Sequence, residues 1–153
     1  MDIRDFHGVV IGAGIAGASA AAHLAPHRRV ALLEMEDAPG YHSTGRSAAI
    51  WVQNYGPADV RALTGLSRAF FEAPPTGFAE APLMRHRPVL FLARADQDAA
   101  MDALLADGIG LRPASAEEAA RMLPAIRPGR IARAAVENDA FDMNVAAIHQ
   151  GFL

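Results

Sequence analysis

Three glycines near the start of the chain have the spacing of a nucleotide-binding turn. Gly12, Gly14 and Gly17 form the pattern G-x-G-x-x-G directly after an apolar run, and Glu34 follows a second apolar run. The first glycine permits a tight turn, the second leaves room for a pyrophosphate, and the third lets the following helix pack closely on the strand. An acidic residue about 20 positions further along suits the hydroxyls of a ribose. The spacing therefore predicts a dinucleotide site.

The elements that would position these residues lie in the same stretch. Short apolar runs at residues 8–11 and 30–33 are typical of buried strands, and the alanine-rich run 15–24 predicts a helix that Pro26 ends. Together they make one βαβ unit over residues 7–34, with the phosphates expected at the helix N-terminus.

The same apolar stretch could also be taken for a secretory signal, since the alanines at 20–22 resemble a cleavage site. Acidic residues offset the one arginine before it, so the positively charged start of a signal peptide is missing. A histidine and an arginine interrupt the run before the roughly 20 residues of a membrane span. We therefore expect no signal peptide, no integral membrane segment and a cytoplasmic location.

Composition narrows the class further. The 153 residues are 52% hydrophobic and 20% charged, which is enough apolar material for a core. A net charge of −3 gives no reason to expect a nucleic acid as a partner. The lack of cysteine excludes disulfides, iron–sulfur clusters and cysteine-linked cofactors. His23 and His27 lack a third ligand beside them, so we expect no metal site.

Further helices and strands are predicted downstream. Pro57 suits the first position of a helix that Pro74 ends. Residues 88–93 and 131–136 predict strands. In the second half, Asp96 is expected to cap a helix that ends at Gly108. Ser115 and Glu118 form a capping box that predicts another short helix. Asp142 is expected to begin a final helix over residues 145–152.

A loop rich in hydroxyls and glycine follows the βαβ unit and reads PGYHSTGRSAA over residues 39–49. Hydroxyls and the cation Arg46 suit phosphate or flavin oxygens, and small residues let backbone N–H groups approach a ring. The sequence leaves open that Ser43 and Thr44 only cap a helix or turn, and that Arg46 is an ordinary surface or ion-pair arginine.

This loop resembles that of the FAD-dependent D-amino acid oxidase/dehydrogenase superfamily, which includes glycine oxidase and sarcosine oxidase. More narrowly, the chain is similar to the D-arginine dehydrogenase type. The resemblance covers only the N-terminal part of the family's length. The other motifs that carry it are Tyr55-Gly56, residues 60–64, residues 67–71, Pro74-Pro75, Arg87-Pro88 and residues 149–151.

The resemblance implies a noncovalently bound FAD, and it argues against attachment through His42. Adenine and ribose would lie near Glu34, the pyrophosphate over the glycine turn, and residues 43–50 along the phosphates and the isoalloxazine ring. The residues implied to contact FAD are Gly12, Gly14, Ala16, Gly17, Glu34, Met35, Ser43, Thr44, Gly45, Arg46, Ser47, Ala48, Ala49 and Ile50.

The resemblance also places Tyr55 near a small-molecule amino acid substrate, on a mobile loop. The sequence alone leaves open that Tyr55 is a buried core aromatic. The family's carboxylate-binding arginine and tyrosine lie downstream, so the catalytic residues are unknown. Relatives that prefer basic D-amino acids have a carboxylate directly after the Arg-Pro pair, whereas Val89 stands there in this chain. With Ile50 and Trp51, this favours neutral or hydrophobic substrates.

The predicted fold is α/β. Residues 1–82 would form a Rossmann-like FAD-binding βαβ domain, residues 83–142 the first part of an inserted α+β substrate domain, and residues 143–153 a helix that returns to the FAD-binding domain. Two strands are too few for a doubly wound sheet. We therefore expect a fragment of a longer fold, completed by a missing C-terminal portion or a second chain.

The expected function is FAD-dependent oxidation of a D-amino acid to the imino acid by hydride transfer to flavin N5, with hydrolysis to the 2-oxo acid and ammonia. A flavoenzyme for a secondary amine or a 2-hydroxy acid stays open. So does a non-catalytic nucleotide-binding fragment or subunit. An NAD-linked dehydrogenase is compatible with Glu34, but the loop over residues 40–49 argues against it.

Overall fold

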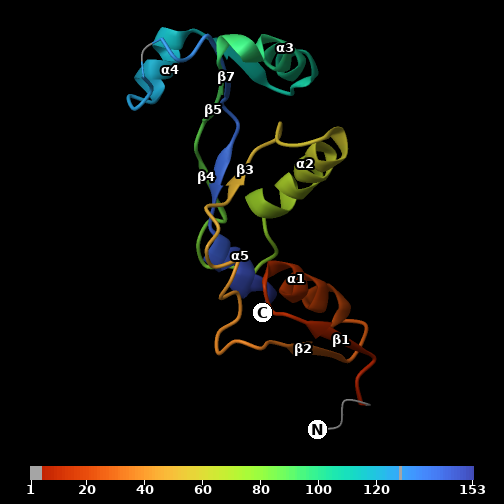
Figure 1. The fold of residues 1–153 in the computed structure, drawn as a ribbon. Coiled ribbons are helices and arrows are strands. Elements are labelled where there is room, and N and C mark those ends of the chain that lie inside the picture. Colours follow the sequence, from red (N-terminus) through yellow and green to blue (C-terminus); the bar gives the residue numbers. More distant parts are fainter. Residues whose placement is uncertain (1–4, 128) are drawn as a thin grey trace. The chain divides into compact units, whose positions relative to one another are not determined.

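The computed structural model describes residues 5–127 and 129–153. The chain forms two compact units and passes between them several times (Figure 1). Unit 1 consists of Met1–Ala49, Ala69–Arg85 and Met143–Leu153, and unit 2 of Ile50–Arg68 and His86–Asp142.

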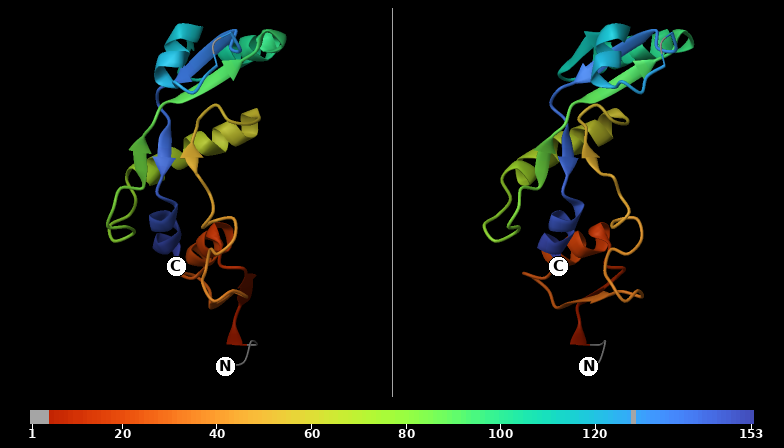
Figure 2. Two further views of the ribbon diagram at one scale, coloured as in Figure 1. Left: turned by 60° about the vertical axis from the view of Figure 1, so that its left-hand side comes forward. Right: turned by 90° about the vertical axis from the view of Figure 1, so that its left-hand side faces the viewer.

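Unit 1 contains the predicted βαβ unit. Strands β1 (Gly8–Ile11) and β2 (Val30–Leu33) are parallel and in register from Gly8 opposite Val30 to Ile11 opposite Leu33. Helix α1 (Ile15–Leu24) makes the crossover and lies against both strands in Figures 1 and 2. Its inward side carries the buried alanines Ala18 and Ala21, whose small side chains let the helix approach closely. The prediction for residues 7–34 is confirmed.

The last helix, α5 (Val145–Phe152), packs beside α1 and closes unit 1. The Phe152 ring stacks on Phe70 at 5.7 Å between centroids and meets Phe78 edge-on at 4.9 Å. The predicted helix 145–152 is confirmed, but the prediction that Asp142 begins it is wrong. Asn144 is the cap, because its Oδ1 accepts a hydrogen bond from Ala147 N–H at 3.1 Å.

Unit 2 is built on an antiparallel sheet of β5 (Val89–Ala93), β6 (Leu111–Ala114) and β7 (Arg133–Glu137), in the order β5-β7-β6. Helices α3 (Asp98–Asp107) and α4 (Ala116–Met122) both contact the central strand β7. Met101 of α3 is buried with Ala93 and Ala135 at the centre of this core.

The strands expected over 88–93 and 131–136 are therefore present, whereas β6 was not predicted. Its sequence contains Pro113, which cannot donate a ladder hydrogen bond and argues against a central strand. In the observed order β6 is an edge strand, where proline is tolerated.

Three further strands are two or three residues long, too short for a sequence pattern to reveal. They are β3 (Ile50–Trp51), β4 (Met84–His86) and β8 (Phe141–Met143), in the order β3-β8-β4. Trp51 pairs with Phe141 across the antiparallel β3–β8 ladder.

Helix starts in unit 2 depart from the predictions in small ways. Helix α2 (Ala58–Glu72) begins one residue after Pro57, whose carbonyl accepts a hydrogen bond from Arg61 N–H at 3.0 Å. Asp96 does not cap α3. It lies in the 3₁₀ helix η2 (Ala95–Gln97), and its carboxylate binds Arg94 instead.

The helix α3 ends at Gly108 as predicted. Only one of the two hydrogen bonds of the predicted capping box is present in the described structure. Ser115 Oγ accepts from Glu118 N–H at 3.2 Å, while the Glu118 carboxylate binds Arg112.

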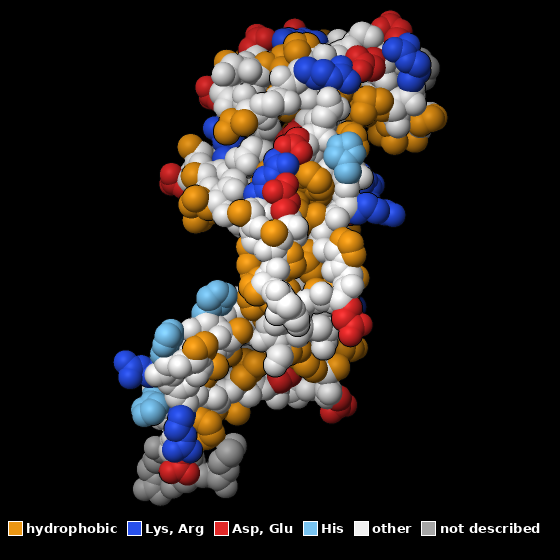
Figure 3. All heavy atoms as spheres, turned by 180° about the vertical axis from the view of Figure 1, so that it is seen from behind, with side chains coloured by type: hydrophobic (Ala, Val, Ile, Leu, Met, Phe, Trp, Pro, Cys, Tyr) orange, Lys and Arg blue, Asp and Glu red, His pale blue; other side chains and the backbone are white. Residues whose placement is uncertain are grey.

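Charged side chains of both signs are interspersed on the face drawn in Figure 3. Within residues 5–127 and 129–153, no helix combines the length and the apolar character needed to cross a bilayer.

Substitution of Met101 tests the core of unit 2. Met101 is 3% exposed, so Met101→Ala should lower the free energy of unfolding by about 3 kcal/mol, through lost burial and the cavity left behind. Leu66 is 78% exposed, so Leu66→Ala should change the free energy of unfolding by less than about 0.5 kcal/mol. Urea unfolding measures both. A cost below about 1 kcal/mol for Met101→Ala would contradict the packing described.

Candidate functional site

The glycine turn between β1 and α1 requires glycine at two positions. Gly12 has φ +92°, in the left-handed region that side chains disfavour. A Cβ on Gly17 would lie 1.8 Å from the carbonyl oxygen of Gly12, so only hydrogen fits between helix and turn. Gly14 is the N-cap residue of α1 and supplies no side-chain cap. The start of α1 therefore presents backbone N–H groups and the positive end of the helix dipole.

Glu34 lies directly after β2, and its carboxylate is held by three backbone N–H groups. Ala13 N–H donates to Oε2 at 2.8 Å, and the N–H groups of Met35 and Glu36 donate to Oε1 at 2.8 and 3.1 Å. These bonds, from Glu36 first and then from Ala13 and Met35, lower the pKa of Glu34 below its ordinary value. The side chain is thus a fixed, exposed acceptor beside the glycine turn.

Thr44 links the loop over residues 39–49 to α1. Its Oγ1 accepts a hydrogen bond from Ile15 N–H at 3.0 Å, and the side chain is buried. Of the two roles that the sequence left open for Thr44, helix capping is therefore present. The hydroxyl proton is not used in this bond and can still be donated to another acceptor.

Arg46 lies on the exposed side of the same loop. Its Nε donates to the carbonyl oxygen of Tyr41 at 3.3 Å, and its guanidinium lies 5.1 Å from the centre of the Tyr41 ring. Within the described part of the chain no ion pair joins Arg46 to a carboxylate, and its exposed side chain still fits the alternative of an ordinary surface arginine. A guanidinium held in this way can serve an anion.

Two adjoining cavities of about 350 Å³ each lie between this loop and α5. Thr44, Ser47 and Val145 line both of them. The first is mainly apolar and is completed by Ile15, Ser43, Ala49, Phe71, Met143 and Ile148. The second is completed by Pro39, Gly40, Gly45, Ala146, His149 and Gln150.

His149 is a residue of this region to which the sequence gave no role. It is buried, and its Nε2 lies 2.7 Å from the carbonyl oxygen of Ala13, so Nε2 carries the proton and donates. A Cβ on Gly40 would come within 2.7 Å of the His149 ring, and Gly40 has φ +75°. His149 therefore joins α5 to both the glycine turn and the loop. No local pattern could reveal a contact between residues so far apart in sequence.

The structure brings together most of the residues predicted to contact FAD. The glycine turn, Glu34, Met35 and residues 43–49 all belong to unit 1. Ile50 belongs to unit 2, in β3, and Tyr55 follows it in the same unit. Tyr55 is 74% exposed, so the alternative that it is a buried core aromatic is wrong.

The two histidines considered for a metal do not share a helix. His23 lies in α1, with Nδ1 at 2.7 Å from the carbonyl oxygen of Ser19, whereas His27 lies beyond the end of that helix. Within residues 5–127 and 129–153, no group of three or more His, Asp or Glu side chains could hold a metal ion.

The groups around the glycine turn fit a dinucleotide that carries a flavin. The start of α1 can receive phosphate oxygens, the Arg46 guanidinium adds a cation, and Glu34 is an acceptor for ribose hydroxyls. The apolar cavity beside Ala49 and Phe71 has the character needed by an aromatic ring system.

Comparison with known proteins identifies the family. A family model described as FAD dependent oxidoreductase matches residues 8–153, so this chain belongs to that family. FAD is therefore its cofactor.

Solved structures agree in fold. Glycine oxidase from Geobacillus kaustophilus superposes with a TM-score of 0.77 at 18% identity, over 96% of this chain and 44% of that one. For FAD-bound L-alpha-glycerophosphate oxidase from Mycoplasma pneumoniae the TM-score is 0.76 at 14% identity, over 96% of this chain and 41% of that one. For iminodiacetate oxidase from Chelativorans sp. BNC1 the TM-score is 0.69 at 22% identity, over 96% of this chain and 43% of that one. The α/β FAD-binding fold is confirmed, and this chain spans less than half the length of these relatives.

Substitution of Gly17 tests the geometry of the turn. Gly17→Ala forces the start of α1 away from Gly12, so the dissociation constant of FAD should rise by a factor of about ten or more. Flavin fluorescence titration measures it. Gly8→Ala is the matched control, because a Cβ there meets nothing within 4 Å. Equal affinities for the two variants would contradict the proposed contact of this turn with the phosphates.

Acid sensitivity tests the bonds to Glu34. Because folding lowers its pKa, Glu34 contributes stability that is present above the ordinary value of 4.5 and is lost as the pH falls through the lowered folded value. Glu34→Gln should therefore reduce the loss of stability on acidification below that value, measured as the urea midpoint at a series of pH values without FAD. The exposed Glu80 supplies the control, Glu80→Gln. If both variants keep the acid sensitivity of the parent chain, the bonds to Glu34 do not differ between the folded and unfolded states.

Proposed function

We propose that this chain is part of a flavoenzyme that binds FAD noncovalently and oxidises a D-amino acid with a neutral or hydrophobic side chain. The observation that carries the proposal is the convergence of the glycine turn, the Glu34 carboxylate and the loop over residues 39–49 in one unit. Membership of the FAD-dependent oxidoreductase family supports it. The names of the glycine oxidase and iminodiacetate oxidase relatives support a substrate with an amine.

The proposed roles follow the chemistry of each group. Glu34 and Met35 would border the adenosine, the turn with Ala16 would receive the pyrophosphate, and Arg46 would neutralise phosphate charge. Thr44 holds the loop on α1, which fixes its neighbours. The residues proposed to follow the flavin are Ser43, Gly45, Ser47, Ala48, Ala49 and Ile50.

When bound, FAD would supply the hydride acceptor that turns the amino acid into the imino acid, which water hydrolyses to the 2-oxo acid and ammonia. The chain's own residues bind and orient. The exposed Tyr55 would contact the substrate, and the apolar lining of the cavity beside Ala49 would exclude water from the ring. The residues that hold the substrate carboxylate would come from outside this chain.

We also propose how the chain is completed. Parallel strands are normally covered on both faces, yet Ile11 at the end of β1 is 86% exposed and Leu33 of β2 is also exposed. The relatives extend well beyond the matched region. Further strands with their crossover helices, from a C-terminal portion or a second chain, would extend this sheet and cover these side chains. Residues 1–82 and 143–153 would then belong to the FAD-binding domain and residues 83–142 to the substrate domain. In this division Ile50–Arg68 would count with the FAD-binding domain, although they pack within unit 2.

The substrate preference is proposed from Val89, which begins β5 after Pro88. A valine offers no charge to a guanidinium or an ammonium group, so the chain would depart from the D-arginine dehydrogenase type in specificity. The alternative substrates are a secondary amine and a 2-hydroxy acid.

The test is anaerobic bleaching of the flavin absorbance in the FAD-loaded protein. Neutral D-amino acids such as D-leucine should bleach it at least about tenfold faster than D-arginine, and L-leucine should not. Val89→Glu should shift the preference toward D-arginine by at least about tenfold. Val89→Gln controls for a polar group at this half-buried site.

Faster bleaching by a secondary amine or a 2-hydroxy acid would replace the proposed substrate class. Retained FAD with no bleaching by any of these compounds would support a non-catalytic nucleotide-binding subunit instead.

A further inference from the structure

Glu137 is a buried carboxylate at the end of the central strand of unit 2. It is 1% exposed, and it stands opposite Val89 of β5 on one side and Leu111 of β6 on the other. Residues opposite one another in antiparallel strands share a face, so the Glu137 side chain leaves the sheet between two apolar neighbours. Burial of a carboxylate is unfavourable unless hydrogen-bond donors surround it.

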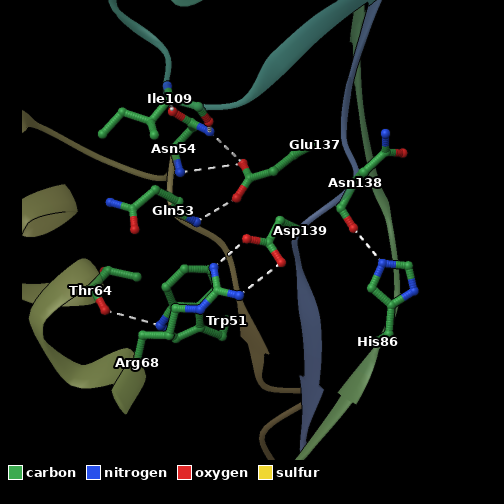
Figure 4. A network of polar contacts seen from close by, with 10 residues as sticks. All are labelled: Trp51, Gln53, Asn54, Thr64, Arg68, His86, Ile109, Glu137, Asn138 and Asp139. Carbon is green, nitrogen blue, oxygen red and sulfur yellow. Dashed lines mark hydrogen bonds and ion pairs between the residues drawn. The ribbon is translucent and has the colours of Figure 1, made fainter. Parts of the chain in front are cut away.

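The donors come from the segment that precedes Tyr55. Gln53 N–H donates to one carboxylate oxygen at 2.6 Å, and Asn54 N–H and Asn54 Nδ2 donate to the other at 3.3 and 2.8 Å. Figure 4 shows the Glu137 side chain directed at these groups. The carboxylate thereby binds two successive backbone N–H groups that belong to no helix or strand.

Asn54 extends the contact to a second loop. Its Oδ1 accepts from Ile109 N–H at 2.7 Å, and its Nδ2 donates to the Ile109 carbonyl at 2.9 Å. The side-chain amide therefore pairs with both polar groups of Ile109 while its other N–H binds Glu137 (Figure 4). We call Glu137, Asn54 and the two backbone segments they bind, Gln53–Asn54 and Ile109, the carboxylate clamp.

Tyr55 is the next residue after this clamp. Because it is 74% exposed, contacts of its own ring do little to fix it. Its position depends on the backbone, which the clamp holds on one side. On the other side Gly56 turns with φ +83° into α2.

We propose that Glu137 and Asn54 are positioning residues for Tyr55, which anchor the start of the substrate-contacting loop, at residues 53 and 54, to the sheet face that carries Val89. This proposal rests on the proposed function, because it takes Tyr55 as a substrate contact. Neither residue touches the substrate. They act by holding the backbone on the N-terminal side of Tyr55.

A neighbouring network supplies the matched control. Asp139, two residues beyond Glu137, forms an ion pair with both terminal nitrogens of Arg68, whose guanidinium lies 5.2 Å from the centre of the Trp51 ring. Figure 4 shows this ion pair beside the clamp. It joins α2 to the end of the sheet, whereas the bonds of the clamp join Glu137 to residues 53 and 54.

Hydrogen–deuterium exchange of the FAD-loaded protein tests the clamp directly. In Glu137→Gln an amide donor replaces one acceptor oxygen, so the amides of residues 53 and 54 should exchange about tenfold faster or more. Asp139→Asn should leave them within about twofold of the parent. Unchanged exchange in Glu137→Gln overturns the clamp. If that variant does not fold, Asn54→Ala should speed the exchange of the Ile109 amide by a similar factor. Unchanged exchange of that amide in Asn54→Ala would likewise overturn the clamp.

Kinetics in a second background separate positioning from general stability. Glu137→Gln should raise KM for the neutral D-amino acid about tenfold, with a smaller effect on kcat. The effect should disappear when Tyr55 is already replaced in Tyr55→Ala, because the two residues act as one unit. An equal loss in both backgrounds overturns the positioning role and leaves Glu137 as a structural residue.

Failure of the proposed function gives a different pattern. If the parent protein binds FAD but no amino acid reduces it, the proposed reaction fails, while hydrogen exchange still decides on the clamp. If Tyr55→Ala leaves KM and kcat unchanged, Tyr55 is not a substrate contact. The positioning role of Glu137 then falls with it, whatever the exchange data show.

Discussion

The close approach of α1 to the glycine turn is the constraint on which unit 1 depends. A Cβ on Gly17 would lie 1.8 Å from the Gly12 oxygen, so the helix lies this close to the turn only because residue 17 has no side chain. The backbone groups of Ala13 and Ile15 lie between these two glycines. Three side chains from distant parts of the sequence then attach to them. Glu34 binds Ala13 N–H, Thr44 binds Ile15 N–H, and His149 binds the Ala13 carbonyl.

These attachments explain how a turn of small residues can be rigid. A turn without side chains has little apolar surface to pack, and glycine has the largest conformational entropy to lose on folding. Hydrogen bonds that Glu34 and Thr44 accept and that His149 donates replace that packing and order the turn before a nucleotide binds. A site that is ordered in advance loses less entropy when its ligand binds, so more of the contact energy contributes to affinity.

The sequence predicted those parts of the fold and site that are encoded locally. The βαβ unit and Glu34 follow from residue type and spacing within a short window, whereas the role of the loop over 39–49 came from a family resemblance. The predicted helix starts were wrong where two polar side chains could serve as the cap or where the predicted cap had another partner. Asp96 has Arg94 as a stronger partner, and Asn144 rather than Asp142 reaches the free N–H of the last helix. His149 and Glu137 could not be predicted, since their partners Ala13 and Asn54 lie far away in the sequence.

Both units use a buried polar side chain for the same physical reason. Much of the buried apolar material is alanine, including Ala18 and Ala21 in α1 and Ala134 and Ala135 in β7. Alanine lets helices and strands approach closely, but it projects too little surface to hold a loop by burial. The loops that carry the proposed chemistry therefore depend on His149 in one unit and Glu137 in the other. Each side chain satisfies backbone groups that would otherwise need water.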